Sequence, residues 1–350
     1  GVLAGDVLAF DRLQLRQRDL LELTGAGSAD LSKEVPAVSG NFEIARLQFP
    51  AAYSTYLANM LASSMLGDLA TTGSLSGAVS LADGAVANLQ LKPRNLDLRD
   101  NKGRFFLSKL EGEIFWSPDA GARVPASRLA WTEGGAYGLS GGGAELAFIA
   151  QAASFALTKP TKLPVLDGAI AIDTFAMGNL GADNMEVAFK GRVEPISMPL
   201  LAEAFGWPQF SGTLAAAIPG VTLKDNVLTF EGNVEAEVFG GRIVGSDIRL
   251  QDPLGRLPRF FADFRARNLD LELVTRTFEV GSITVRLDAD VLGLELFAWA
   301  PEKFDARLAT PPGDKSRHKI SAKAVSSLSN VGGGGGGVVQ ALQSGVLKFF

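Results

Sequence analysis

The chain contains 350 residues and has a net charge of −5 at pH 7, which argues against a nucleic-acid-binding surface. It has no cysteine, so disulfide bonds and thiolate metal sites are excluded. Hydrophobic residues make up 47% of the sequence, but no window supplies the roughly 20 consecutive apolar residues that a membrane-spanning helix needs. The aromatic residues are 22 Phe, 4 Trp and 3 Tyr, and this Phe-rich set favours surroundings without polar partners, such as a dry core or acyl chains.

In chain order, alternating runs predict strands at 3–15 and 42–47 with a polar loop at 25–36 between them, followed by an amphipathic helix near 50–66. Apolar residues of the helical stretch recur three and four apart, at Tyr53, Tyr56, Leu57, Met60, Leu61 and Met65. Pro50 near its start and Gly67 at its end are typical helix boundaries. The stretch carries no charge, whereas membrane-surface helices usually carry Lys or Arg. We therefore expect this helix to lie over one end of a sheet.

Strands are predicted again from Gly73 onward, with a second short helix at 198–205. Pro199 lies in the first turn of this helix, and Gly206 follows its last residue. Six glycines at 332–337 predict a flexible hinge before a short amphipathic helix at 338–350. We expect 1–330 to form one elongated β module, and 331–350 to form the hinge and the terminal helix.

The clearest alternation lies between residues 260 and 308. The apolar residues Ile283, Val285, Leu287, Ala289 and Val291 alternate with Thr284, Arg286, Asp288 and Asp290. In the same way, Leu269, Leu271 and Leu273 alternate with Asp270 and Glu272. Successive side chains of a strand point to opposite faces, so these patterns predict strands that are apolar on one face and charged on the other. Such strands do not suit a parallel α/β sheet, and they leave stacked sandwiches, a solenoid or one long curved sheet.

Few residues could carry catalysis or bind a metal. His318 is the only histidine and lies in a polar, basic loop, which favours a solvated side chain over a catalytic triad. Asp288 and Asp290 could suit calcium or a glycosidase, but neighbouring strands are charged on the same face, which favours a solvated surface. The glycine run at 332–337 lacks the Lys and Ser/Thr of a phosphate-binding loop. We expect the protein not to be an enzyme, and we expect no cofactor and no metal.

Several segments resemble the YdbH-like branch of the AsmA/TamB superfamily. In chain order they are FPAAYSTYL at 49–57, GTLAAAIPG at 212–220, VFGG at 238–241, RNLDLELVTRTF at 267–278, and the segments at 281–299 and 316–337. The resemblance covers most of the chain, and its specific motifs lie in the C-terminal third. It implies a bridge-like lipid-transfer protein of Gram-negative bacteria. It also implies a mainly β fold, in which a long, curved antiparallel sheet with two or three short helices forms an open groove, apolar inside and polar outside.

The resemblance and the apolar strand faces together predict a groove floor that contacts phospholipid acyl chains. We assign to this floor Leu228, Phe230, Val234, Val238, Ile248, Leu250, Phe260, Phe264, Leu269, Leu271, Leu273, Ile283, Val285, Leu287, Val291, Leu294, Leu296, Phe304 and Leu308. An apolar face of this extent needs a cover in water, and lipid tails or a second sheet would both provide it. Two other functions therefore stay open. One is a structural or adhesive β-sandwich or solenoid without a lipid channel, and the other is a polysaccharide-acting β-helix with paired carboxylates.

The resemblance also predicts a location and partners. Related proteins are anchored in the inner membrane and cross the periplasm towards the outer membrane. This sequence starts at Gly1 without the N-terminal membrane anchor of such proteins, and it stops at Phe350, where relatives continue with further strands. We therefore expect a fragment of a longer periplasmic protein. Contacts with the two membranes would then lie outside this chain. Sheet edges predict pairing with a strand from a partner, for example an outer-membrane lipoprotein, while phospholipids are the expected ligands and nucleic acid is not.

Overall fold

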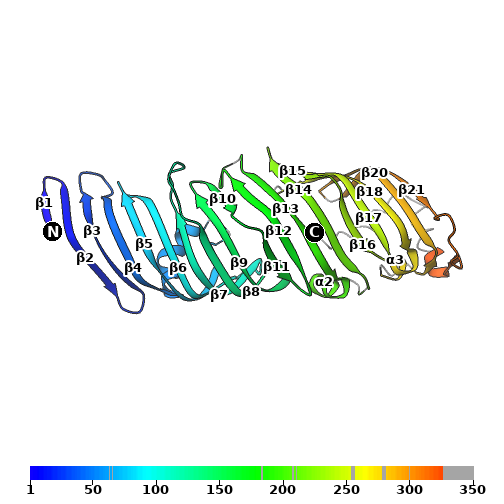
Figure 1. Ribbon diagram of the computed structural model, residues 1–350, viewed down its shortest axis with the longest axis horizontal. Helices are drawn as coiled ribbons and strands as arrows, with labels where there is room; N and C mark the ends of the chain where they lie inside the picture. The colour runs from blue at the N-terminus through cyan, green and yellow to red at the C-terminus, as the bar shows by residue number, and fades with distance from the viewer. Residues whose placement is uncertain are drawn as a thin grey trace. The chain divides into compact units, whose positions relative to one another are not determined.

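The computed structural model describes residues 1–62, 64, 66–182, 184–206, 209, 211–253, 257–277, 281–298 and 300–325. The chain is mainly β, with 66% strand and 10% helix, which confirms the predicted class. Its strands form one long antiparallel sheet that is not closed (Figure 1). The hinge and terminal helix predicted at 331–350 lie outside the described residues. The chain divides into two compact units.

The first unit comprises Gly1–Pro164 and Ala176–Leu180. Its elements are β1 (Val2–Ala4), β2 (Val7–Gln17), β3 (Leu21–Asp30), β4 (Ala37–Phe49), the π-helical turn η1 (Tyr53–Leu57), α1 (Ala58–Leu61), β5 (Leu69–Ala82), β6 (Ala85–Asp100), β7 (Phe105–Trp116), β8 (Ser127–Ala136), β9 (Leu139–Gln151) and β10 (Ser154–Leu157). From β1 to β10, each strand pairs antiparallel with the next one along the chain. The strands β11 (Thr161–Val165) and β12 (Gly168–Gly178) contribute residues to both units.

The second unit comprises Val165–Phe175 and Gly181–Phe350. Its elements are β13 (Glu186–Ser197), α2 (Met198–Phe205), β14 (Thr213–Lys224), β15 (Val227–Glu231), β16 (Val234–Val238), β17 (Gly241–Gln251), β18 (Arg259–Asp270), α3 (Leu271–Thr277), β19 (Ile283–Thr284), β20 (Arg286–Phe297), β21 (Ala300–Ala309) and β22 (Lys319–Ile320). Its long antiparallel pairs are β13–β14, β17–β18, β18–β20 and β20–β21, and both β15 and β16 pair with β17. The short strands β19 and β22 form a separate two-stranded sheet.

The pairing register aligns the side chains of neighbouring strands in rows, one of them wholly apolar and the next one mixed. On β4 to β7 of the first unit, one row consists of Phe42, Val79, Leu89 and Trp116. The row beside it consists of Glu43, Ala78, Gln90 and Phe115. Directly opposed side chains share a face, and successive ones alternate, so these rows lie on opposite faces of the sheet.

Several strand pairs are interrupted by β-bulges in their interiors. Asn95 in β6 (φ 45°) and Asn268 in β18 (φ 57°) lie at such register shifts and have left-handed backbone conformations, which Asn tolerates better than most residues. A bulge inserts an extra residue on one strand and bends that strand locally. The long strands therefore bend partway along their length.

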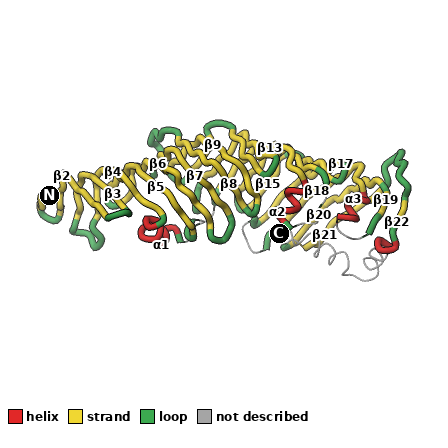
Figure 2. The backbone as a smooth tube through the Cα atoms, turned by 90° about the horizontal axis from the view of Figure 1, so that it is seen from below, coloured by secondary structure: helices red, strands yellow, loops and turns green. Residues whose placement is uncertain are grey.

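Both helices predicted within the strand regions are present. The first lies within the predicted span as η1 and α1, and Figure 2 shows α1 beside β5. The second is α2, whose bounds match the prediction. It ends at Gly206 in the left-handed conformation (φ 66°), and the N–H group of Gly206 is bonded to carbonyl groups of the last turn.

The predicted alternation fails at 271–277, where the chain forms the helix α3 instead of a strand. Asp270 ends β18 and caps the helix, because its Oδ1 accepts hydrogen bonds from the N–H groups of Glu272 (3.0 Å) and Leu273 (3.3 Å). An ion pair between Glu272 and Arg276, one turn apart, stabilises the helix further. Leu271 and Leu273 therefore belong to a helix, and their prediction as strand residues was wrong.

The strand predicted at 283–291 is divided at Val285. Ile283 pairs with Ile320 in the two-stranded sheet, whereas Leu287 pairs with Leu269 in the long sheet. Val285 lies in a bend between them, and its carbonyl group accepts a hydrogen bond from the N–H group of Leu271 (3.1 Å). The first residue of α3 thus bonds to the Val285 carbonyl group, which a continuous strand would have used for its own pairing.

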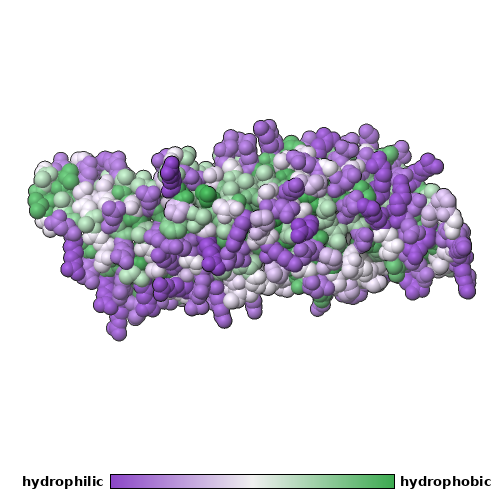
Figure 3. Space-filling model, viewed as in Figure 1, coloured by the Kyte–Doolittle hydropathy of each residue, from purple (hydrophilic) through white to green (hydrophobic). Residues whose placement is uncertain are grey.

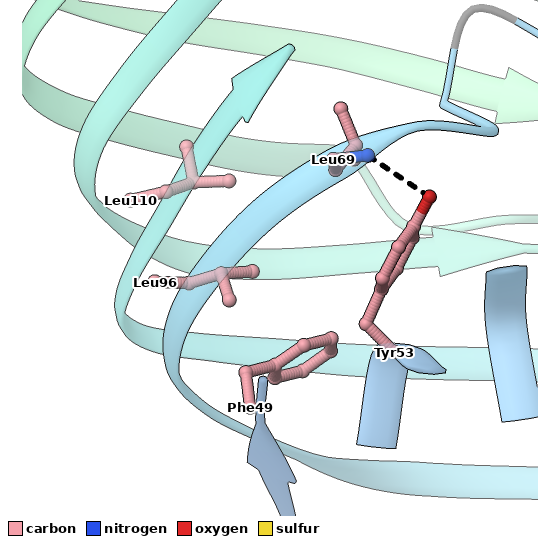
Figure 4. Packing of buried hydrophobic residues seen from close by; sticks show 5 residues of the cluster. All are labelled: Phe49, Tyr53, Leu69, Leu96 and Leu110. Atoms are coloured by element: carbon pink, nitrogen blue, oxygen red, sulfur yellow. Dashed lines mark hydrogen bonds between the residues drawn. The ribbon is translucent and has the colours of Figure 1, made fainter. Parts of the chain in front are cut away.

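The buried core cluster of the first unit lies where η1 and α1 meet the sheet. It consists of Phe49, Tyr53, Leu69, Leu96 and Leu110, shown in Figure 4, all at most 9% exposed. Partly buried residues pack around it, among them Leu47, Leu57, Leu61, Leu75, Leu98, Leu107, Leu129 and Trp131. The helical segment and strands β4 to β8 together enclose this cluster.

Candidate functional site

The register of the second unit joins four predicted floor residues and Leu223, which was not predicted, into a continuous row. Leu223 of β14 lies opposite Leu228 of β15, which lies opposite Leu250 of β17. Leu250 in turn lies opposite Phe260 of β18, and Phe260 lies opposite Leu296 of β20. Since directly opposed side chains share a face, five strands present one unbroken apolar row.

A second row on the same face, separated from the first by the Ala262–Leu294 pair, runs through Gly245, Phe264 and Val291. Val234 lies opposite Gly245, Gly245 opposite Phe264, and Phe264 opposite Val291. A Cβ atom at Gly245 would lie 2.9 Å from Cδ1 of Ile248 and 3.1 Å from Cε1 of Phe264, so these two side chains fill the space above the glycine. The rings of Phe264 and Phe260 stack with centroids 6.4 Å apart, which connects the second row to the first.

The remaining predicted residues lie at the following positions. Phe230 is opposite Val221, Leu294 opposite Ala262, Leu269 opposite Leu287, Leu308 opposite Ala289, and Val238 opposite Gly241 at the β16–β17 turn. Phe304 lies in β21, two residues before Ala306, the partner of Val291. Leu271, Leu273, Ile283 and Val285 lie in α3, in β19 and in the bend, and so do not join the rows of the long sheet.

The other face of the same strands carries charges that pair with one another. One of its rows runs through Arg249, Phe261, Glu295 and Lys303. The carboxylate of Glu295 lies 3.6 Å from the Lys303 ammonium group. The guanidinium groups of Arg249 and Arg259 lie 5.5 Å from the ring centroids of Phe261 and Phe297, respectively.

Most of the predicted floor residues are half-buried. Ile248 and Leu269 are buried, at 7% exposed, while Phe304 and Leu308 remain 48% and 65% exposed. Half-burial is the state expected of a side chain whose flanks contact neighbours within a sheet while part of its outer surface stays open. Figure 3 shows one side of the molecule, on which hydrophobic residues (green) lie between hydrophilic ones (purple).

The apolar face of the first unit was not among the site residues predicted from the sequence. Leu96 and Leu98 alternate along β6, and Leu107 and Leu110 lie opposite them on β7. Farther towards the amino end, Leu13 and Leu15 of β2 are 37% and 49% exposed. The signal that could have identified them is the same period-two alternation that marked the second unit.

The two carboxylates considered as calcium or glycosidase candidates, Asp288 and Asp290, have structural partners. Asp288 accepts a hydrogen bond from the N–H group of Asn268 (2.8 Å), and Asp290 forms an ion pair with Arg267 (2.6 Å). Among the residues that the structure describes, no group of three or more His, Asp or Glu side chains is placed to hold a metal ion.

His318 lies in the loop before β22, where its Nε2 atom is 3.0 Å from Oδ2 of Asp314. The Ser316 hydroxyl group donates to Asp314 (2.6 Å), and the N–H group of Arg286 donates as well (3.2 Å). These hydrogen bonds, that from Ser316 above all, hold the pKa of Asp314 well below its usual value. The Asp314 carboxylate therefore attaches the loop to the start of β20.

No helix in the described part of the chain combines the length and the apolar character that crossing a bilayer requires. Comparison of the chain with protein-family models, curated proteins and solved structures found no match.

Proposed function

We propose that this chain is part of a bridge-like lipid-transfer protein, in which the bent sheet forms an apolar groove that conducts phospholipid acyl chains across the periplasm between the inner and outer membranes. The observation that carries the proposal is the unbroken row from Leu223 through Leu250 and Phe260 to Leu296. The row is apolar, extends over five strands, and consists of half-buried side chains except for Leu223, which is buried. The charged rows on the other face keep that face compatible with water.

The dimensions of the row suit an acyl chain. Neighbouring strands lie about 4.8 Å apart, so a row across five strands extends roughly 19 Å. The hydrocarbon core of a bilayer is about 30 Å thick, so the tails of one leaflet extend about 15 Å. A single tail could therefore lie along the row over its whole length.

The chemistry of the row suits transport better than fixed binding. Each methylene group removed from water contributes about 0.8 kcal/mol, so a lipid tail would be held firmly in sum. The hydrophobic effect has no preferred direction, so a tail can slide along the row without breaking specific bonds. The bulges at Asp247 in β17 and Asn268 in β18 support the proposed groove, because bulges bend strands.

Two neighbouring phenylalanines on opposite faces provide the test. In Phe260→Asp, a carboxylate enters the apolar row between Leu250 and Leu296, and we expect most of the bound phospholipid to be lost. In the matched control Phe261→Asp, the same change falls on the polar face beneath Arg249, and lipid content should stay at the wild-type level. The measurement is mass spectrometry of solvent extracts of each purified protein, with circular dichroism to verify folding.

Two outcomes would count against the proposal. Wild-type protein free of phospholipid after exposure to vesicles would remove the basis for a conduit. Equal lipid content in folded Phe260→Asp and Phe261→Asp would show that bound lipid does not depend on the apolar row. Either result would favour a structural or adhesive β protein without a lipid channel.

A further inference from the structure

The apolar face of the first unit is covered by a short part of its own chain. After Phe49 the chain leaves β4, forms η1 and α1 at residues 53–61, and returns to the sheet at Leu69. We call residues 53–61 the cover segment. Tyr53 at its start and Ala52 directly before it are 8% and 0% exposed, and Leu57 and Leu61 pack against the buried cluster.

The cluster residues of β6 and β7 lie beneath the cover segment, on the face that the alternation makes apolar. Leu96 of β6 lies opposite Leu110 of β7, and both are 5% exposed (Figure 4). Leu98 and Leu107 form the next pair of the same two strands. The cover segment therefore lies over apolar side chains of the strands of the first unit.

The cover segment is attached mainly by apolar contact. The sequence from Pro50 to Leu66 contains no charged residue, so no salt bridge between side chains can hold it in place. The Tyr53 hydroxyl group donates to the Leu66 carbonyl group (2.8 Å) and accepts from the N–H group of Leu69 (3.1 Å; Figure 4). The Tyr56 hydroxyl group donates to Oε1 of Gln17 in β2 (2.6 Å).

An apolar ligand can replace an apolar cover while only a few hydrogen bonds, chiefly the two of the Tyr53 hydroxyl group, are broken. If the segment moves away, acyl tails can take over the contacts with Leu96 and Leu110, and the exchange is one apolar surface for another. The tyrosine hydroxyl groups can bond to water when released. A segment held by ion pairs or by a buried polar network would not permit this exchange at low cost.

We propose that the cover segment is a lid that phospholipid acyl chains displace from the apolar face of strands β4 to β8. The inference rests on the proposed function for the identity of the ligand. It adds that loading of the first unit requires the lid to move, so the attachment of the lid sets the rate of loading.

The position of the lid can be followed with a spin label. The chain has no cysteine, so Met60→Cys, at a position that is 70% exposed on α1, provides a single labelling site. Val35→Cys, at a position that is 78% exposed in the loop before β4, provides the matched control label. On addition of phosphatidylethanolamine–phosphatidylglycerol vesicles, we expect the label at position 60 to become more mobile and the label at position 35 to stay unchanged. Bound lipid is measured on the same samples by mass spectrometry.

The attachment of the lid can be weakened without emptying the cluster. Tyr53→Phe keeps the ring and removes both hydrogen bonds of the hydroxyl group, so lipid loading should be roughly two- to tenfold faster. Tyr137→Phe removes a hydroxyl group at a position that is 65% exposed in the β8–β9 turn, and should load at the wild-type rate.

The outcomes separate the lid from the proposed function. If lipid binds while the mobility of the label at position 60 and the loading rate of Tyr53→Phe stay unchanged, the lid proposal is overturned and the lipid-transfer proposal is not. Absence of bound lipid from every protein would overturn lipid transfer, and the lid with it.

Discussion

Two regions of the sheet share one pattern and differ in what covers it. Around Leu96 and Leu110 in the first unit, apolar side chains are 5% exposed beneath η1 and α1. Around Phe260 and Leu296 in the second unit, side chains of the same kind and on the same kind of antiparallel pair are half-buried. A sheet thus covers the flanks of its own side chains, and full burial needs a further layer.

The largest expected difference between the regions is in the cost of removing a leucine side chain. Leu96→Ala should lower the free energy of unfolding by about 2–5 kcal/mol, because it leaves a cavity under the helical cover. Leu296→Ala should cost about 1 kcal/mol, because the lost atoms already contact water in part. Hydrogen exchange at increasing urea concentration measures both values and follows each unit separately.

Equal losses of unfolding free energy in Leu96→Ala and Leu296→Ala would contradict the difference in burial between the two regions. They would mean that the surroundings of Leu296 are packed as completely as the cluster around Leu96. Leu110→Ala repeats the first measurement on the neighbouring strand and should match Leu96→Ala.

A smaller, pH-dependent effect on stability is expected from Asp100, at the β6–β7 turn beside the covered cluster. The Asp100 side chain is fully buried and accepts hydrogen bonds from the backbone N–H (2.9 Å), Nε (2.9 Å) and Nη2 (2.6 Å) of Arg104. The bonds from the Arg104 side chain, above all, lower the pKa of Asp100 to about 2. Asp100→Asn keeps the shape of the side chain and removes its titration.

The direction of the pH effect follows from the lowered pKa. Asp100 is charged in the folded state at pH values where the unfolded chain, with a pKa of about 3.9, begins to bind the proton. Its contribution to stability is therefore complete above about pH 4 and is lost as the pH falls towards about 2. The urea midpoint of the wild type should exceed that of Asp100→Asn near pH 6, and this difference should shrink in acid. A difference that stays constant from about pH 6 to about pH 2 would show that the charge of Asp100 does not act in this way.

The smallest effect is expected on the polar face of the second unit. Glu295→Gln removes the ion pair with Lys303, whose side chain is 74% exposed, and should change the free energy of unfolding by less than about 1 kcal/mol. Added salt should reduce the change further, and lipid content should stay as in the wild type. A large loss of bound lipid in this variant would contradict the assignment of lipid contact to the opposite face.

The sequence determined those features that depend on neighbours along the chain. Period-two alternation predicted which side chains of β18 and β20 share a face, and Pro199 with Gly206 predicted both ends of α2. At Leu271 and Leu273 the alternation favours a strand, but two other local features, the cap from Asp270 and the Glu272–Arg276 ion pair, stabilise a helix instead. Tertiary structure decided the rest. The opposition of Leu250, Phe260 and Leu296 depends on pairing between distant segments, and the bulge between β17 and β18 shifts that pairing by an amount that local propensity does not encode. Likewise, Leu96 and Phe260 lie in strands with the same alternation in sequence, and the position of η1 and α1 in space, which the alternation does not encode, buries Leu96 more fully.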